Sequence, residues 1–459
     1  MLVAPAEPPS DSAAVRRLNL SRVLRHIAER GPCSRSEVSV ATGLAHGSLT
    51  ALTADLIDRG LVREAGLTPA GGRGRPRRQL ELVPGRVLTL AVRITRQRLQ
   101  TTVADLAGEA VHRASLPHRT PRGDPRPLAR AVASALREAR AAALAVPGAY
   151  VWGAVLAMPG PVDADGAHVF STDFGWPGPV DLAGLVREEL RRTGPDEDPV
   201  ELPLALVNDA NLAALAEYRA LAARRGTAPR SLAYLKADIG VGGGLVLDGR
   251  IHTGGHGVAG EPGHMPVAFD GPACACGGRG CLALYVGPEA LTDAAGLAGL
   301  RASAGPDAAL AALGAALAAG ERRALDALDA AGEVLGAAVL AVTSLLDVDE
   351  VVLGGYLADW HPWLEPGLTA RLSGRRALVD LLVPDPVPGV LGADAALTGA
   401  LTYGRDAVLD DPAAVPGAGP GSASASASAS ASASSGGSGS DSNSASASGS
   451  GVSRGSASG

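Results

Sequence analysis

Short apolar segments alternate with longer helical segments through the middle of the chain, and this alternation restricts the fold more than any other feature. Strands are expected at residues 86–94, 99–106, 151–156, 204–207, 232–236 and 351–353. Helices are expected near residues 126–145, 210–222, 321–346 and 392–404. Strands that alternate with helices build sheets with helices packed against their faces. The pattern therefore predicts an α/β body.

Composition changes at both ends of this body divide the 459 residues into parts. Residues 1–14 are rich in Pro and Ala and are expected to be frayed. Residues 415–459 are mostly Gly, Ser and Ala, which bury too little apolar area to offset the entropy of ordering, so a disordered tail is expected. Between these ends we expect a separate module over residues 15–82 and the α/β body over residues 86–408.

Charge separates the module from the body. Residues 15–80 contain 12 Arg and five acidic residues, a local net charge of +7, although the whole chain carries −6. The remaining residues therefore sum to −13. A basic module on an acidic body predicts a polyanionic partner for the module alone.

The chain lacks the sequence features of membrane and secreted proteins. No uncharged apolar run reaches the ~20 residues that a membrane helix needs, and the first residues do not have the pattern of a secretory signal. Three of the four cysteines fall within eight residues, which indicates a metal site in a reducing compartment rather than a disulfide scaffold. We therefore expect a cytoplasmic protein with no membrane partner.

Three helices and a basic extended segment are predicted in the N-terminal module. The first helix buries Leu20, Val23, Leu24 and Ile27. The second begins at a capping box, Ser34-Arg35-Ser36-Glu37, and a turn follows at Gly43-Leu44. The third buries Leu49, Leu52 and Leu56 and leaves His46, Ser48 and Thr50 facing outward. Helix, turn, helix and a basic wing predict a winged helix-turn-helix whose third helix enters the DNA major groove.

The wing alternates Arg with Gly and Pro. Arg73, Arg75 and Arg77 lie on a slim ribbon that fits an A·T-rich minor groove, whose negative potential attracts Arg. Two alternatives stay open. The module fits a three-helix docking domain, and the Arg stretch fits a flexible linker with incidental charge.

Four soft ligands lie close together in the body: His264, Cys274, Cys276 and Cys281. Tetrahedral zinc accepts one imidazole and three thiolates, and the intervening glycines allow the tight turns that bring thiolates together. Because no coordination position stays open, the zinc is expected to be structural, in a loop spanning residues 264–281. The alternative is three unrelated buried cysteines. Cys33 stands alone and is expected in the core.

Asn208 and Asp209 follow a predicted strand and precede a predicted helix. Ligands of α/β sheets commonly bind at such carboxyl ends, where a carboxylate accepts a hydroxyl proton or a polyol hydrogen bond. The alternative for Asn-Asp is a helix cap. Glycine-rich turns at residues 240–244 and 354–355 have a shape that approaches phosphate or ribose.

Together these motifs resemble the ROK family (repressors, open reading frames and kinases) over residues 15–408. The module is similar to that of the family's xylose- and N-acetylglucosamine-type repressors through Arg17, Asn19, Ser34-Arg35, Gly43-Leu44 and Gly72-Arg73. The body is similar through Pro159-Gly160-Pro161-Val162, Asn208-Asp209-Ala210-Asn211, Glu261-Pro262-Gly263-His264, the cysteine cluster and Gly354-Gly355, which resembles the family's adenosine motif. The resemblance implies an actin-like (ribonuclease H-like), two-lobed body.

The resemblance also implies a function. The chain is expected to be a transcriptional regulator, in particular a repressor, that binds a double-stranded DNA operator and senses a sugar or sugar phosphate. A homodimer or homotetramer is expected. Family residues that bind sugar hydroxyls match Asn208, Asp209, Glu261 and His264, and the imidazole of His264 would link zinc to the ligand through its two ring nitrogens.

Several positions depart from the family's kinases. Where those kinases carry Asp-x-Gly to organise metal and phosphate, the chain has Arg93-Ile94-Thr95. Arg cannot bind Mg²⁺, and Thr blocks the close backbone approach that Gly permits. Since phosphoryl transfer depends on positioning phosphate and metal, we expect that the chain is not an enzyme and that Asp209 is a vestige of the catalytic base.

The expected sugar site departs from the family as well. Asp173 replaces an Asn, and Ala283 replaces a Glu two residues past the last zinc cysteine. One lost charged hydrogen bond costs ~1.5–3 kcal/mol, so the ligand differs from a common hexose, binds weakly or is no longer sensed. Two further hypotheses follow: a zinc-containing, ATP-dependent sugar kinase (glucokinase-like) that carries a DNA-binding domain, and a ligand-blind regulator controlled by a protein partner.

Overall fold

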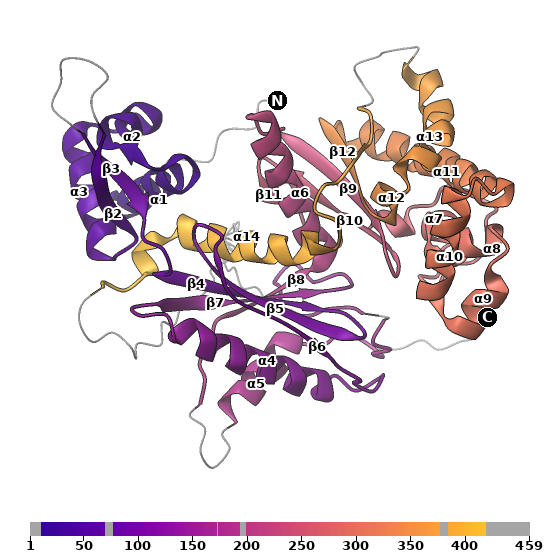
Figure 1. The fold of residues 1–459 in the computed structure, drawn as a ribbon, viewed down its shortest axis with the longest axis horizontal. Coiled ribbons are helices and arrows are strands. Elements are labelled where there is room, and N and C mark those ends of the chain that lie inside the picture. The colour runs from indigo at the N-terminus through magenta and orange to yellow at the C-terminus, as the bar shows by residue number, and fades with distance from the viewer. Residues whose placement is uncertain (1–10, 69–76, 172, 193–198, 377–383, 419–459) are drawn as a thin grey trace, which may run out of the picture. The chain divides into compact units, whose positions relative to one another are not determined.

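Three groups of elements make up the described part of the chain (Figure 1). The computed structural model describes residues 11–68, 77–171, 173–192, 199–376 and 384–418. The first group is the N-terminal module. The other two are five-stranded sheets, each with its own helices, which we call the first and the second lobe.

The N-terminal module contains three helices and a small antiparallel sheet. Its helices are α1 (Ser12–Arg30), α2 (Arg35–Thr42) and α3 (His46–Asp58). The strands β2 (Val62–Thr68) and β3 (Arg77–Leu82) form a hairpin, and β1 (Cys33–Ser34) pairs with β3. The predicted capping box is present, because Ser34 and Glu37 each bind the other's backbone N–H. All the apolar residues predicted for the first and third helices are buried, as is Cys33.

The core of this module extends to residues near the end of the described chain. Val408, Leu409 and Val415 are buried in the same apolar cluster as the helices of the module. Arg59 donates to the carbonyl oxygens of Ala413 and Val415. A disordered tail beginning at residue 415 was therefore expected too early, because an apolar side chain and two carbonyl acceptors fix this segment. Residues 1–10 and 419–459 lie outside the described residues.

The first lobe is a mixed sheet with the strand order β6-β5-β4-β7-β8. Its strands are β4 (Val87–Ile94), β5 (Arg98–Asp105), β6 (Ala110–Pro117), β7 (Tyr150–Met158) and β8 (Leu204–Asn208). One face packs against α4 (Arg126–Leu144) and α5 (Leu182–Arg191). Because β4, β7 and β8 are parallel, their carboxyl ends meet at one edge, which places Arg93 and Asn208 on the same side of the sheet.

The second lobe is a sheet with the strand order β11-β10-β9-β12-β13. Its strands are β9 (Ser231–Ala237), β10 (Val241–Leu247), β11 (Arg250–Ile251), β12 (Glu350–Gly355) and β13 (Val387–Pro388). Its helices are α7 (Ala283–Val286), α8 (Pro288–Ala294), α9 (Ala298–Ala304), α10 (Pro306–Ala318), α11 (Arg322–Leu346), α12 (Tyr356–Asp359) and α13 (His361–Arg376). The sequence pattern predicted α11 but missed the other helices of this lobe. In α10, Ala and Leu lie on all sides and give no distinct apolar stripe, whereas α13 does bury a stripe of Leu364, Leu368 and Leu372.

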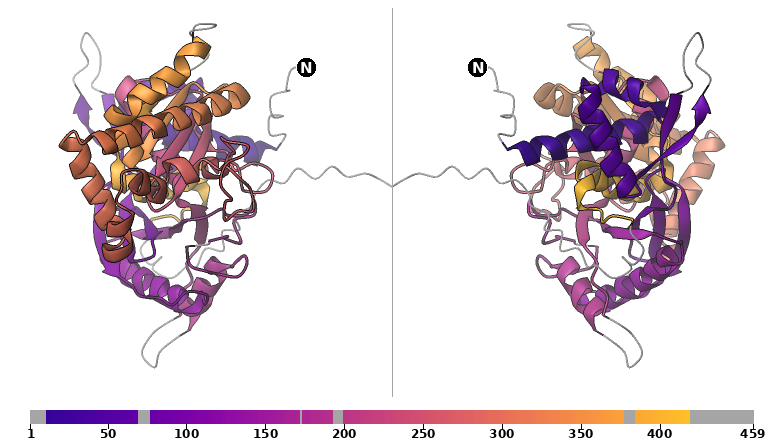
Figure 2. Two further views of the ribbon diagram at one scale, coloured as in Figure 1. Left: turned by 90° about the vertical axis from the view of Figure 1, so that its right-hand side faces the viewer. Right: turned by 90° about the vertical axis from the view of Figure 1, so that its left-hand side faces the viewer.

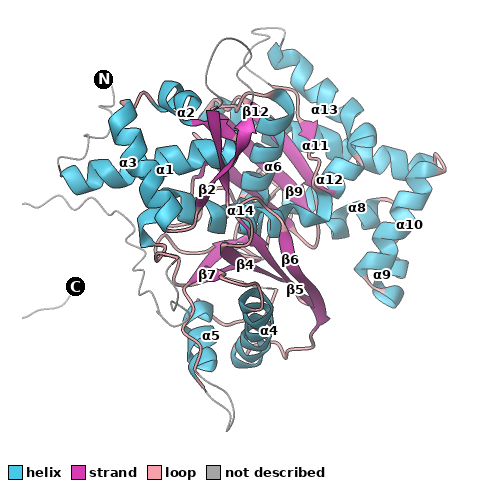
Figure 3. Ribbon diagram, turned by 60° about the vertical axis from the view of Figure 1, so that its left-hand side comes forward, coloured by secondary structure: helices cyan, strands magenta, loops and turns pink. Residues whose placement is uncertain are grey.

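Two helices lie between the sheets, α6 (Asp209–Arg225) and α14 (Ala395–Asp410) (Figure 3). α6 buries Ala213, Ala214 and Tyr218 against the second sheet. Leu212 of α6 and Ala400 of α14 pack against Ala91 and Val155 of the first sheet. Both lobes therefore contact the helix pair formed by α6 and α14.

Among the described helices, α11 is the one whose length and apolar composition would allow it to cross a membrane. The core helix of a globular lobe passes the same test. Leu328, Leu335 and Val339 of α11 are buried in the core of the second lobe, and α13 packs along this helix (Figure 2).

Candidate functional site

Asn208 caps the helix that carries Asp209. Its Oδ1 accepts from the backbone N–H groups of Ala210 and Asn211, both at 2.9 Å, and its Nδ2 donates to the carbonyl of Gly160 at 2.9 Å. The side chain is 5% exposed. The helix-cap interpretation of Asn208 is thus confirmed, and the cap fixes Asp209 at the first turn of α6, where the carboxylate also meets the positive end of the helix dipole.

Asp209 forms a buried ion pair with Lys236. The Nζ of Lys236, on β9, lies 3.0 Å from Oδ2 of Asp209 and 3.2 Å from Oδ2 of Asp238. Burial alone would raise the pKa of Asp209, but the Lys236 ammonium, with a smaller contribution from Arg93, lowers it below the usual value. Burial would lower the pKa of Lys236, but Asp209 and Asp238 raise it. Both groups are therefore charged at neutral pH.

Two further acids face this ion pair. Burial, with a smaller contribution from the charge of Asp209, raises the pKa of Glu261 to about 7. The same two causes, in the same order, raise the pKa of Asp173, although Arg96 and Arg122 oppose the rise. The residues predicted for the sugar site, Asp173, Asp209 and Glu261, thus lie within electrostatic range of one another. Three carboxyl groups in a partly buried site favour a ligand rich in hydroxyl donors.

The loop that carries Asp173 is held by stacked rings. Phe174 and Trp176 stack with centroids 5.1 Å apart, and the guanidinium of Arg96 lies 5.2 Å from the centre of the Phe174 ring. Both rings are buried. Both rings belong to the core of the first lobe, so the stack anchors this loop there.

Arg93 and Thr95 are both engaged at the β4–β5 turn. Nη1 of Arg93 donates to Oε1 of Gln100 at 3.3 Å and to the carbonyl of Ala393 at 3.1 Å. Thr95 Oγ1 closes the turn by accepting from the backbone N–H of Arg98 at 3.0 Å. Arg93 therefore places a fixed positive charge near Asp209 and ties the first lobe to the segment before α14.

The glycine-rich segments serve packing. Gly242, Gly243 and Gly244 belong to strand β10 rather than to a turn, which corrects the predicted shape. A side chain at Gly244 would collide with Asn211 of α6, and one at Gly243 with Pro262. On β12, the space over Gly354 holds the hydroxyl of Tyr234, and Gly355, with a φ of +57°, meets the carboxylate of Asp238. These glycines let α6 and the Glu261 loop approach the sheet closely.

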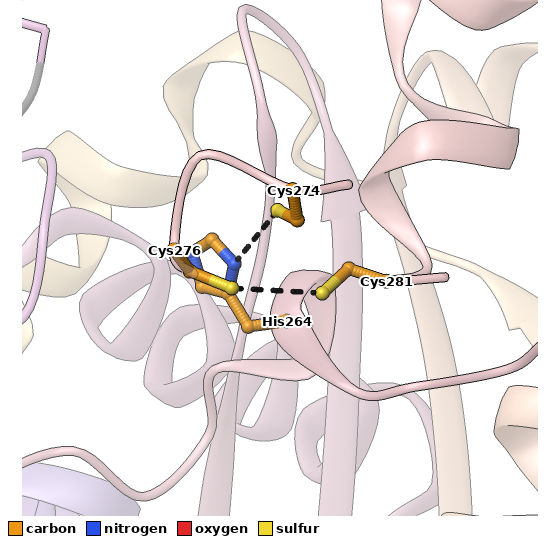
Figure 4. Close-up of side chains that lie close together, drawn as sticks. All are labelled: His264, Cys274, Cys276 and Cys281. Atoms are coloured by element: carbon orange, nitrogen blue, oxygen red, sulfur yellow. Dashed lines mark hydrogen bonds between the residues drawn. The ribbon is translucent and has the colours of Figure 1, made fainter. Parts of the chain in front are cut away.

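The predicted metal ligands converge in one loop of the second lobe (Figure 4). The ligand atoms of His264, Cys274, Cys276 and Cys281 all lie within 4.8 Å of one another. The Sγ atoms of Cys276 and Cys281 are 3.6 Å apart, and Nδ1 of His264 lies 3.9 Å from Sγ of Cys274. Tetrahedral zinc with Zn–S bonds of about 2.3 Å places its sulfurs about 3.8 Å apart, so the cluster fits such an ion.

Two features connect the metal loop to the ligand site. Glu261 directly precedes the 3₁₀ turn Pro262–His264 and His264 ends it, so one short segment carries a candidate ligand residue and a metal ligand. Ala283 begins α7, two residues after Cys281, and its methyl group offers no polar atom to a ligand. Ala283 therefore cannot make the hydrogen bond that is expected of a Glu at this position.

The outward residues of α3 have the predicted exposure. His46, Ser48 and Thr50 are exposed, whereas Leu49 between them is buried. Thr50 Oγ1 donates to the carbonyl of His46 within the helix. Ala45 occupies the N-cap position and makes no side-chain cap. Of the three wing arginines, Arg73 and Arg75 lie outside the described residues, and the backbone of Arg77 begins β3.

Sequence reasoning missed Lys236 and Asp238, because no motif marks a lysine near the end of an apolar strand. It also missed Arg25 on α1, whose Nη1 lies 2.9 Å from Oδ1 of Asp406 on α14. A usable signal existed for Lys236, since it is the only lysine of the chain. No local signal exists for Arg25 and Asp406, which are 381 positions apart.

Known proteins resemble this chain in both sequence and structure. Residues 89–406 match the model of the ROK family. N-acetylmannosamine kinase of Citrobacter koseri is 38% identical over 35% of this chain and 51% of the kinase, so the match spans about half of that relative. Glucokinase of Streptomyces coelicolor is 32% identical over 46% of this chain and 69% of the kinase. The crystal structure of a ROK family transcriptional regulator, described as a homolog of the E. coli MLC protein, is similar with a TM-score of 0.69 and 25% identity over 86% of this chain and 97% of the regulator.

These relatives confirm one prediction and contradict another. The actin-like, two-lobed α/β body predicted from the sequence is confirmed. The prediction that the chain is not an enzyme is contradicted, because the relatives found by sequence are named N-acetylmannosamine kinase, kanosamine kinase and glucokinase. The prediction gave too much weight to Arg93 and Thr95 and too little to the residues of the predicted sugar site, Asp173, Asp209 and Glu261.

Proposed function

Because the chain belongs to the ROK family, we propose that it is a DNA-binding transcriptional regulator that responds to a sugar or sugar phosphate. The observation that carries this proposal is the likeness to a ROK transcriptional regulator, which covers 86% of the chain. The ROK match over residues 89–406 and all the residues after it together make up less than that share, so the likeness extends into the residues before 89. Repression is the proposed direction of control, and the cytoplasm is the proposed location.

The N-terminal module is proposed to act as a winged helix-turn-helix. Exposed His46, Ser48 and Thr50 on α3 would contact base edges in the major groove. Arg73, Arg75 and Arg77 would supply affinity that tolerates sequence changes. The net charge of +7 over residues 15–80 supports a polyanionic partner at this module.

The carboxylates of Asp173, Asp209 and Glu261 are proposed to bind the sugar, with Asn208 holding the start of α6 and His264 linking the ligand to the metal loop. The metal is proposed to be one structural zinc. It would fix the turn that carries Glu261, since the metal loop and this turn share His264. Zinc has no open coordination position in this ligand set, so it would take no part in chemistry.

Ligand binding can reach the DNA-binding module through the helix pair between the lobes. α6 begins at Asp209, and two turns later Glu217 accepts from the backbone N–H groups of Val390 and Leu391, just before α14. Further along α6, Arg219 lies 2.9 Å from Oδ2 of Asp406. The other oxygen of Asp406 accepts from Arg25 of α1 at 2.9 Å. One carboxylate thus joins the ligand-site helix to a helix of the module.

Sugar binding is proposed to change the interlobe angle and so the spacing of two modules in a homodimer or homotetramer. Half-sites need centres about 34 Å or a multiple apart. A ligand shifts this equilibrium only by its differential affinity for the two states, and about 2–3 kcal/mol changes DNA affinity roughly 30- to 150-fold.

The test begins with selection of bound duplexes from a random DNA pool by the full chain. A selected sequence should bind at least a hundredfold more tightly than a scrambled duplex. Replacing His46, Ser48 and Thr50 together by Ala should abolish this preference but leave nonspecific binding. Replacing Arg73, Arg75 and Arg77 by Ala should instead weaken binding to both duplexes and reduce the salt slope by up to ~0.9 per lost phosphate contact. A pool that yields no preferred sequence would contradict the proposal.

Sugar phosphorylation is the second candidate function. The relatives named N-acetylmannosamine kinase and glucokinase favour it. Asp209 keeps the charge that a base for a sugar hydroxyl requires, because the Lys236 ammonium outweighs its burial. The test is an ATP-dependent phosphorylation assay with N-acetylmannosamine and glucose, using Asp209→Asn as control. Product formation that Asp209→Asn abolishes would establish a kinase, with or without DNA binding.

A further inference from the structure

The only lysine of the chain stands in the ligand site. Every other fixed cation is an arginine, so the chain uses an ammonium at this one position. A lysine differs from an arginine in being a compact point charge with three donors that rotate freely. What a lysine provides at this position therefore depends on the groups around Lys236.

Lys236 connects the two lobes. It lies on β9 of the second sheet, whereas Asp209 follows β8 of the first sheet. Their side chains are 10% and 13% exposed, and the Nζ–Oδ2 distance is 3.0 Å. Water screens such a pair little. The interaction is therefore a short, shielded ion pair between the two lobes.

The cross-strand neighbours of Lys236 are Gly242 on β10 and Gly354 on β12. The hydroxyl of Tyr234 fills the space over Gly354, whereas even an added Cβ at Gly242 would make only an ordinary contact with Ala210. The strand β10 therefore places no side chain beside the lysine stem. Oδ2 of Asp238, in the turn after β9, lies 3.2 Å from the same Nζ, so this carboxylate forms a second ion pair with Lys236.

The groups that face Asp209 from other elements are mostly acidic. Glu261 lies on the loop before the 3₁₀ turn, Asp173 on the stacked-ring loop, and Asp238 after β9. The opposing cations are Lys236 and, from β4, Arg93, whose Nη1 is already bonded to Gln100 and Ala393. Lys236 is therefore the cation in direct contact with the Asp209 carboxylate.

We propose that Lys236 is a positioning residue of the ligand site, which holds the Asp209 carboxylate charged and in one orientation to accept a hydroxyl of the bound sugar. This role rests on the proposed sugar binding. The ammonium of Lys236 balances the charge of Asp209 within the protein, so the carboxylate is charged and oriented before any ligand binds. The ligand class is a polyhydroxy compound that is uncharged where it meets Asp209, because Glu261 and Asp173 surround that position with acidic groups.

Replacing Lys236 by Met should remove the positive charge that keeps Asp209 ionised. Met keeps the apolar stem and removes the charge, which leaves Asp209 buried beside Glu261 and Asp173. Burial and like charges then favour the protonated acid. A protonated Asp209 no longer accepts a charged hydrogen bond, so sugar affinity at pH 7 should fall about 10- to 150-fold. Lys236→Arg keeps the charge and should recover most of the affinity.

The experiment uses the full chain with two measurements. Calorimetry reports the affinity for glucose and for N-acetylmannosamine in the wild type, Lys236→Met and Lys236→Arg. Carbon NMR of a γ-carboxyl-labelled aspartate sample, with the Asp209 signal assigned through Asp209→Asn, reports protonation of this carboxyl. We expect no titration between pH 5 and 8 in the wild type or Lys236→Arg, and titration in that range in Lys236→Met.

The two measurements separate the possible failures. An Asp209 signal that does not titrate in Lys236→Met, or sugar affinities that match the wild type, would overturn the role of Lys236 while leaving sugar binding intact. A wild-type chain that binds neither sugar would contradict the proposed function and the positioning role together. Lower affinity in Lys236→Met with titration of Asp209, both reversed in Lys236→Arg, would establish the role, because loss of packing alone moves no carboxyl titration.

Discussion

The ligand site and the third helix of the N-terminal module use polar side chains in opposite ways. In the site, Asp209 and Lys236 are nearly buried and bind each other. On α3, His46 and Ser48 are exposed, and Thr50 bonds only back along its own helix among the interactions described. Buried polar groups must be partnered before a ligand arrives, whereas exposed groups keep their hydrogen bonds for a partner. In the ligand site, the same side chains therefore affect both folding stability and ligand binding. On α3, the side chains that would bind a partner contribute little to folding stability.

The largest effect is expected where internal partners are most concentrated, at the metal cluster. Cys276→Ser should lose the zinc and destabilise the second lobe strongly, since structural zinc contributes on the order of 10 kcal/mol of binding free energy in small domains. Elemental analysis and thermal unfolding measure both. Cys33→Ala, which removes a buried cysteine outside the cluster, should keep one zinc per chain. A wild type purified without chelator that contains no zinc would contradict the assignment.

The next effect tests the comparison directly. Asp209→Ala leaves the Lys236 ammonium buried without its closest partner, which should lower the free energy of unfolding by roughly 3–5 kcal/mol. Ser48→Ala on α3 should change it by no more than about 0.5 kcal/mol. Urea unfolding of the two variants provides the measurement. Equal free energies of unfolding in the two variants would contradict the proposed difference between the ligand site and α3.

Glu261 should make stability depend on pH. Its pKa is about 7 in the folded chain and near 4.5 without the fold, so the folded state holds this proton more tightly. Burial of Glu261 therefore costs nothing below about pH 4.5, and its cost grows to roughly 2–3 kcal/mol as the pH rises through 7. Glu261→Gln should remove this part of the pH slope in urea unfolding measured from pH 5 to 8. An unchanged slope in Glu261→Gln would show that Glu261 is ionised in the folded chain.

The smallest stability effect is expected at the contact between the module and α14. Arg25→Ala removes the pairs with Asp406 and Asp410, which are partly exposed and contribute about 1 kcal/mol or less. Its effect on control should be larger, because sugar would no longer alter DNA affinity to the wild-type extent. Arg22→Ala on the exposed side of α1 is the matched control for lost charge. Equal sugar responses in both variants would remove this contact from the coupling path.

Most of the body could be predicted from the sequence, because its strands and long helices are continuous apolar or amphipathic segments. The metal loop could be predicted as well, since its four ligands lie within 18 consecutive residues. The charged partners could not. Lys236 reaches Asp209 only because two sheets meet, and Arg25 reaches Asp406 only because α14 returns to the module. Such pairs depend on tertiary structure, which no local pattern encodes.

The limits of motif reasoning are visible at residues 240–244 as well. Glycines after a strand suggested a phosphate-binding turn, but Gly242, Gly243 and Gly244 form part of β10. At Gly243 and Gly244, the approach of Pro262 and of Asn211 on α6 leaves no space for a Cβ atom. Glycine at these positions therefore allows close packing. The spacing of glycines in the sequence does not distinguish this role from ligand binding.

This chain is proposed to bind specific DNA under the control of a sugar. The most direct measurement is fluorescence anisotropy of the selected duplex with the full chain, without ATP, in the absence and presence of glucose, N-acetylmannosamine and their phosphates. We predict specific binding that one of these compounds weakens roughly 30- to 150-fold, and no such response in Asp209→Ala. Specific DNA binding that none of them alters, or that Asp209→Ala still releases, would contradict the claim.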